Sequence, residues 1–132
     1  MLDKKLLILQ VIYENYKRNN ASTIRRVQLK ELCNDRLFEM TGGQQDDLGG
    51  SFQRHLRELE SNGILTQASN KERKQTMILF NIEKIEYLPL DNRLDKPDDK
   101  TVKRIEADFD KPWEEMIEEV YSAEIDKAIK LS

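Results

Sequence analysis

The sequence predicts a mainly α-helical protein with one small β-hairpin and a C-terminal amphipathic helix. Three observations predict this fold class. Apolar residues recur at steps of three and four in four long segments, which is the spacing of one helix face. One pair of short segments, separated by a polar stretch, is rich in β-branched and aromatic residues, as the strands of a hairpin are. Four of the five glycines lie between residues 42 and 50, which marks a loop.

Two helices are expected in the first third of the chain. The first spans about residues 3–18 and is mostly buried on one side, with no Gly or Pro to interrupt it. The second is expected to begin at Ser22 or Thr23, since either side chain can cap a helix N-terminus. It ends before the Gly-rich turn of residues 40–50, or runs to about Met40. Its apolar positions are Val27, Leu29, Leu32, Cys33 and Leu37.

Two arginines stand at the start of the second helix. Arg25 and Arg26 occupy its predicted first turn, where the helix dipole disfavours cations. A phosphate partner would explain them, because a helix N-terminus attracts anions. Ordinary solvent exposure explains them equally well.

A third helix is expected over about residues 51–61. Phe52, Leu56 and Leu59 lie at positions i, i+4 and i+7 and form its buried face. Gly63 follows and is expected to provide a left-handed C-terminal cap.

A hairpin is expected next, with strands at residues 64–68 and 76–82. Its polar tip holds Lys71, Arg73 and Lys74. Such a tip is either solvated or in contact with a polyanion.

The rest of the chain has a different character. Residues 83–99 are expected to be an extended acidic connection, followed by a short helix around Val102, Ile105 and Phe109. The last helix is expected from Pro112 onwards, with Glu114 and Glu115 early and lysines late, as the helix dipole favours. The predicted organisation is a first domain over residues 1–85, an acidic linker with a short helix over 86–111, and a C-terminal amphipathic helix over 112–132.

Composition and charge exclude several classes of protein. Residues 1–80 hold 13 Lys and Arg against 10 Asp and Glu, a net charge of +3, whereas residues 81–132 hold 9 against 15, a net charge of −6. A single Cys excludes an internal disulfide framework, and one Cys and one His cannot by themselves supply a structural zinc site. Hydrolase and nucleotide-binding motifs are absent, so we expect no enzyme activity, metal or cofactor. Apolar runs reach only four residues, so we expect a cytoplasmic protein without a membrane span.

Residues 51–65 read S-F-Q-R-H-L-R-E-L-E-S-N-G-I-L. This stretch resembles the recognition helix and following turn of winged helix-turn-helix regulators of the arsenic-repressor and multiple-antibiotic-resistance types. The order of helices, Gly-rich turn and basic-tipped hairpin over residues 5–82 is similar to the same superfamily. The resemblance implies a winged helix-turn-helix fold and sequence-specific binding of double-stranded DNA by a transcriptional regulator. The chain departs from the pattern in its long turn of about ten residues before the third helix.

The chemistry of the third helix agrees with this implication. The major groove of DNA admits one α-helix. In that groove an Arg side chain can pair with guanine, and a Gln side chain can pair with adenine. The hairpin cations would neutralise phosphates. Alternatively, Arg54 and Arg57 are a solvated helix face, His55 is a packing residue and the hairpin cations only solubilise a turn. The predicted DNA-binding residues are Ser51, Gln53, Arg54, His55, Arg57, Lys71, Arg73 and Lys74, with Arg25 and Arg26.

A second function from another class fits the same sequence. The weak net charge and the acidic tail suit a winged-helix module that binds proteins, or an accessory protein of replication initiation, because a fold does not fix a process.

The last helix is expected to form a homodimer. A DNA-binding protein with one recognition helix per subunit gains affinity when a dimer contacts two half-sites. The interface is predicted between helix one and the last helix of two subunits; the alternative is that the last helix folds back on its own subunit. The predicted dimerisation residues are Trp113, Met116, Ile117, Val120 and Tyr121.

Overall fold

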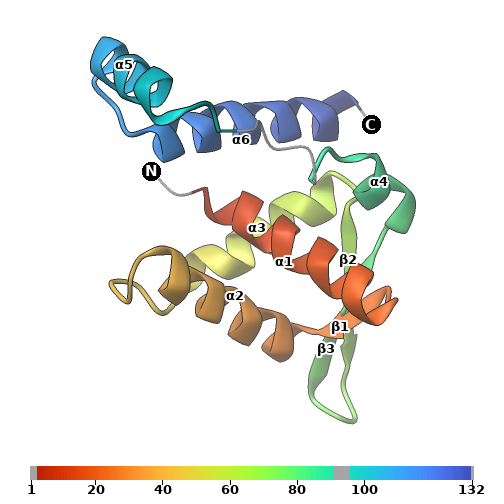
Figure 1. Cartoon of the computed structure of the whole chain (residues 1–132). Coiled ribbons are helices and arrows are strands. Elements are labelled where there is room, and N and C mark those ends of the chain that lie inside the picture. The colour runs from red at the N-terminus through yellow and green to blue at the C-terminus, as the bar shows by residue number, and fades with distance from the viewer. Residues whose placement is uncertain (1–2, 91–95, 132) are drawn as a thin grey trace.

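The computed structural model describes residues 3–90 and 96–131, and it is mainly helical with one small sheet (Figure 1). This confirms the coarse fold class predicted from the sequence. The elements follow the order α1 (Lys4–Asn19), β1 (Thr23–Arg25), α2 (Arg26–Met40), α3 (Gly50–Ser61), β2 (Leu65–Asn70), β3 (Gln75–Phe80), α4 (Ile82–Tyr87), α5 (Asp99–Phe109) and α6 (Trp113–Leu131).

The sheet is antiparallel, with the strands in the order β1-β3-β2. β2 and β3 form the predicted hairpin, from the pair Leu65–Phe80 at its base to the pair Asn70–Gln75 beside its turn. β1 lies on the other side of β3, where Ile24 pairs with Ile78. Ile24, Ile78 and Phe80 are buried, so one face of the sheet packs against the helices.

Strand β1 corrects the prediction that Ser22 or Thr23 caps α2. The Ser22 carbonyl accepts a hydrogen bond from the Phe80 N–H (2.8 Å), and Thr23 pairs with Leu79. α2 therefore begins only at Arg26, and no side chain caps it. The backbone of this segment pairs with a strand more than fifty residues later in the chain, and a local pattern does not reveal such a partner.

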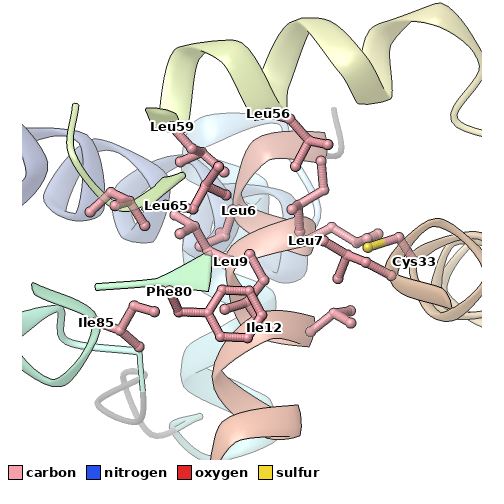
Figure 2. Packing of buried hydrophobic residues seen from close by; sticks show 14 of the residues in the cluster. Leu6, Leu7, Leu9, Ile12, Cys33, Leu56, Leu59, Leu65, Phe80 and Ile85 are labelled. Atoms are coloured by element: carbon pink, nitrogen blue, oxygen red, sulfur yellow. The ribbon is translucent and has the colours of Figure 1, made fainter. Parts of the chain in front are cut away.

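The first half of helix α1 is buried on all sides, rather than on one side as predicted, whereas its second half, from residue 13 to residue 19, is half-buried or exposed. The Asp3 carboxylate caps its start by accepting a hydrogen bond from the Leu6 N–H (3.1 Å). Every residue from Leu6 to Ile12 is buried. Figure 2 shows leucines of α1 surrounded by Leu56 and Leu59 of α3, together with Cys33, Leu65, Phe80 and Ile85 from four other elements.

Helix α2 buries less of its apolar surface than predicted. Leu29, Cys33 and Leu37 are fully buried, whereas Val27 is 69% exposed and Leu32 is 37% exposed. α2 runs to Met40, one of the two ends that the sequence allows.

The turn before α3 is anchored to the body of the protein. Leu48 is buried, and its N–H donates a hydrogen bond to the Asn34 side-chain oxygen (2.9 Å). α3 then starts one residue earlier than predicted and ends where predicted. The expected cap is confirmed, since Gly63 has a φ of +76°, and the Gly63 and Ile64 N–H groups donate to the Glu60 and Leu59 carbonyls (3.0 Å each).

Helix α4 corrects the prediction of an extended connection at residues 83–87. The Asn81 side chain caps it, Ile85 enters the core, and Glu86 accepts a hydrogen bond from the Tyr16 hydroxyl (2.8 Å). Leu88 and Leu90 are also buried. The buried core thus continues beyond residue 85, where the first domain was predicted to end.

Helix α6 folds back on its own chain. Tyr121, Ile125 and Ile129 belong to the central buried cluster, and the Lys5 ammonium lies 2.6 Å from the Asp126 carboxylate. Tyr121 is 3% exposed, so this predicted dimerisation residue is buried within its own chain. The last helix thus folds back on its own subunit, which is the alternative that the sequence left open, and the homodimer stays a prediction. Within residues 3–90 and 96–131, no helix is long and apolar enough to cross a membrane.

Candidate nucleic-acid interface

Helix α3 presents two arginines to solvent. Phe52, Leu56 and Leu59 are at most 3% exposed and hold one side of the helix against the core. Arg54 and Arg57 lie on the other side and are exposed. Neither makes a hydrogen bond or ion pair with another residue of the described chain. Two guanidinium groups are therefore available to an external partner.

The turn of the β2–β3 hairpin presents three more cations, Lys71, Arg73 and Lys74, all exposed. The Asn70 side-chain oxygen fixes this turn by accepting hydrogen bonds from the N–H groups of Glu72 (3.0 Å) and Arg73 (3.2 Å). The cations are thus carried on a defined turn, with Glu72 as the one acid among them.

A chain of side-chain hydrogen bonds joins α2, α3 and the hairpin. Arg26 Nη1 donates to Gln53 Oε1 (3.3 Å), and Gln53 Nε2 donates to Gln67 Oε1 (3.2 Å). The Gln67 N–H in turn donates to the Glu60 carboxylate (2.8 Å). The predicted base-reading amide of Gln53 is therefore engaged within the protein, where it fixes the first turn of α3 against β2.

A hollow of about 400 Å³ lies between the first turns of α2 and α3. Arg26 and Lys30 line it together with Val27, Gly49 and Gln53. Lys30 is not among the residues predicted from the sequence, although its position four residues after Arg26 places both cations on one side of a helix. Arg25 is exposed at the end of β1 and directly precedes Arg26 in the sequence.

The remaining predicted residues of α3 have local roles. The Ser51 hydroxyl donates to the Leu48 carbonyl (2.5 Å), which closes the turn before α3. His55 is half-buried, and its Nδ1 lies 3.5 Å from a Glu58 carboxylate oxygen. Both residues are less accessible than Arg54 and Arg57.

A metal centre and a reactive thiol are two other kinds of site that the side chains could form. Among the described residues, no group of three or more His, Cys, Asp or Glu side chains is arranged to hold a metal ion. Cys33 is fully buried in α2, as the sequence predicts for a small core residue. Its burial raises the pKa of the thiol to about 12, which opposes formation of the reactive thiolate.

Comparison with family models, with curated proteins and with solved structures gave no match to this chain.

Proposed function

We propose that residues 4–80 form a winged helix-turn-helix domain that binds double-stranded DNA, with α3 in the major groove and the β2–β3 hairpin as the wing. The observation that carries the proposal is the element order α1-β1-α2-α3-β2-β3 with strands in the order β1-β3-β2. This order combines an exposed, arginine-bearing helix with a cation-tipped hairpin.

The hydrogen bonds between the elements support one continuous binding surface. Gln53 links the first turn of α3 to the middle of β2 and to Arg26 of α2. Arg57 lies about 6 Å further along α3, and the cations of the turn lie about 10–15 Å further along the hairpin. Seven cations thus lie on α2, α3 and the β2–β3 turn, the elements that the Gln53 hydrogen bonds join: Arg26, Lys30, Arg54, Arg57, Lys71, Arg73 and Lys74.

The chemistry of these residues divides into two roles. Arg54 and Arg57 have free guanidinium groups on the outer side of α3, and a guanidinium can pair with both major-groove acceptors of guanine. The hairpin cations, Arg26 and Lys30 would neutralise backbone phosphates, which adds affinity but no sequence discrimination. Because residues 1–80 have a net charge of only +3, binding to random DNA is expected to be weak and strongly dependent on salt.

The test is a selection of duplexes from a random library by the full chain, followed by fluorescence-anisotropy titration of the selected and a scrambled duplex. Arg57→Ala should weaken binding to the selected duplex by about 1–3 kcal/mol and leave the scrambled duplex nearly unaffected. Arg18→Ala, an exposed arginine on the last turn of α1, is the matched control. Failure to enrich any duplex, with no measurable binding at low salt, would overturn the proposal.

A protein-binding module is the second candidate function. It is favoured by the exposed apolar residues of α2, since Val27 is 69% exposed and Phe38 is 52% exposed. Under that function, a Val27→Asp variant would lose a protein partner and Arg57→Ala would have no effect.

A further inference from the structure

The hollow between the first turns of α2 and α3 holds two cations that have no acidic partner. Arg26 and Lys30 line the hollow, and both are half-buried. Within the described residues, the Arg26 guanidinium donates one hydrogen bond, to the neutral Gln53 side-chain oxygen (3.3 Å), and the Lys30 ammonium forms neither a hydrogen bond nor an ion pair. A cation that is partly removed from water loses solvation, which a bound counter-charge restores. An anion in this hollow is therefore expected to be stabilised.

The acids nearest to these cations in the sequence do not supply that counter-charge. No Asp or Glu is among the described residues that line the hollow. Glu31 follows Lys30 directly but is exposed and pairs with neither cation. The Asp47 carboxylate accepts a hydrogen bond from the Gly49 N–H (2.8 Å) and also pairs with neither cation. A counter-charge for the hollow would therefore come from outside the described chain.

The two cations are placed to hold one anion together. They are four residues apart on α2, which brings their Cβ atoms within about 5–6 Å on one side of the helix. Gln53 holds the Arg26 side chain, and its own Nε2 donates to Gln67 Oε1 (3.2 Å). The guanidinium keeps further N–H donors that can bind an oxyanion through two parallel hydrogen bonds, and the ammonium adds a point charge. This combination favours a phosphate group.

The hollow also has room for the carbon atoms to which a phosphate is attached. Its volume of about 400 Å³ lies at the lower end of the range for small-molecule sites. Gly49 contributes no side chain, and a Cβ built there would meet no atom within 4 Å. Val27 lines the same hollow and is 69% exposed, which offers an apolar contact to a sugar ring. The space therefore suits a sugar-linked phosphate.

We propose that this hollow binds one phosphate group attached to a sugar, held by Arg26 and Lys30 together. Two sources supply that chemistry: the backbone of DNA, and a free sugar phosphate or nucleotide. With the first source, the inference rests on the proposed DNA-binding function and adds that both cations contact the same phosphate, which fixes the position of α2 on the backbone. With the second source, the hollow is a small-molecule site.

The first experiment titrates the full chain with inorganic phosphate at constant ionic strength and follows the backbone amide signals by NMR. We expect saturable shifts of residues 26–30 and 49–53, with a Kd of about 1–10 mM. Lys30→Gln should weaken this binding about tenfold, because a charge-assisted contact is lost, and Lys30→Arg should restore most of it. Lys103→Gln is the matched control, since Lys103 is an exposed lysine of α5 without a partner among the described residues. Circular dichroism verifies that the variants are folded.

The second experiment distinguishes the two sources of the phosphate. Thymidine 5′-monophosphate and inorganic phosphate are compared as ligands of the free chain, and a preference of about tenfold or more for the nucleotide assigns the hollow to a free phosphate ester. Equal affinities assign it to the DNA backbone if Lys30→Gln also makes the salt dependence of duplex binding shallower by about 0.9 in slope. Equal affinities with an unchanged slope would overturn the inference.

Two further results of the phosphate titration would also overturn it. One is the absence of saturable shifts up to about 50 mM phosphate, and the other is an equal loss of affinity in Lys30→Gln and Lys103→Gln. The DNA titration separates this inference from the proposed function. A chain that binds phosphate in the hollow but binds no duplex would overturn the DNA-binding function alone, and a chain that binds a duplex but no phosphate would overturn the inference alone.

Discussion

Gln53 and Arg54 are neighbours on α3 with opposite surroundings. Both have side chains that can read bases, and the sequence predicts the same role for both. Gln53 is half-buried and hydrogen-bonded to Arg26 and Gln67, whereas Arg54 is exposed and unpaired within the described residues. Residue type indicates what a side chain is able to bind, but the partners that it finds within the protein decide whether it remains available.

Gln53→Leu should therefore act through the position of α3 rather than through base reading. It removes two side-chain hydrogen bonds at the joint between α3 and β2, and is expected to lower the free energy of unfolding by about 1–2 kcal/mol. DNA affinity should fall by a similar factor for selected and scrambled duplexes. Urea unfolding and anisotropy titration measure the two effects. A decrease confined to the selected duplex would show that Gln53 reads a base.

Cys33 leads to a prediction about stability and pH. Burial raises the pKa of its thiol from 9.0 to about 12, so the folded state holds this proton more tightly than the unfolded state. The contribution to stability is complete below pH 9 and is lost as the pH rises from 9 towards 12, by about 1.4 kcal/mol per pH unit. Comparison with Cys33→Ala isolates this contribution, because all other groups titrate in both proteins.

Urea unfolding between pH 8 and 10.5 makes that comparison. The stability of the wild type should decline more steeply with pH than that of Cys33→Ala. Parallel declines would mean that the thiol is solvated in the native state. A thiol reagent gives an independent check, since at pH 8 it should label Cys33 only after unfolding.

At the scale of elements, the periodic segments are those that the sequence predicts well. α1, α3, α6 and the β2–β3 hairpin have lengths and apolar spacing that match one structure. β1 and α4 are missed because each is short and held by distant partners, β1 by β3 and α4 by α1 through Tyr16. The candidate site, too, could be predicted from the sequence only in part. Its cations are visible in the sequence, but the hydrogen bonds around Gln53 and the hollow beside Lys30 depend on tertiary contacts.

The β2–β3 turn carries the prediction that belongs to this scale. Replacement of Lys71, Arg73 and Lys74 by alanine removes three exposed cations. If each cation neutralises one phosphate, the slope of log K against log salt concentration should become shallower by about 0.9 for each cation removed. Preference for the selected duplex over the scrambled one should stay unchanged. Titrations at salt concentrations between about 50 and 300 mM measure both quantities, and an unchanged slope would remove the hairpin from the interface.

At the scale of the whole molecule, the two halves of the chain differ in charge and are joined by a common core. The cations of the proposed DNA surface lie on α2, α3 and the β2–β3 turn, and α6, which carries Glu114, Glu115, Glu118 and Glu119, lies at the end of the molecule away from that turn (Figure 1). Under the proposed function, this separation would keep the acids of α6 away from phosphates that contact the turn. The second half of α6 nevertheless contributes Tyr121, Ile125 and Ile129 to the same buried cluster as α1, so the two halves are expected to unfold together.

The stability of the whole chain should therefore depend on α6. Ile125 is 1% exposed, and Ile125→Ala is expected to lower the free energy of unfolding by about 2–5 kcal/mol, because apolar packing is removed and a cavity is left behind. Leu32→Ala, on the partly exposed side of α2, is a helical control that should cost less than about 1.5 kcal/mol.

Deletion of residues 112–132 removes all three buried side chains of α6. Each is worth about 1.5–3 kcal/mol, and the stability of a whole domain is typically about 5–15 kcal/mol. The truncated chain should lose most of its cooperative unfolding transition in urea, followed by circular dichroism. A truncated chain that unfolds cooperatively at the wild-type midpoint would show that α6 only covers a core that is already complete.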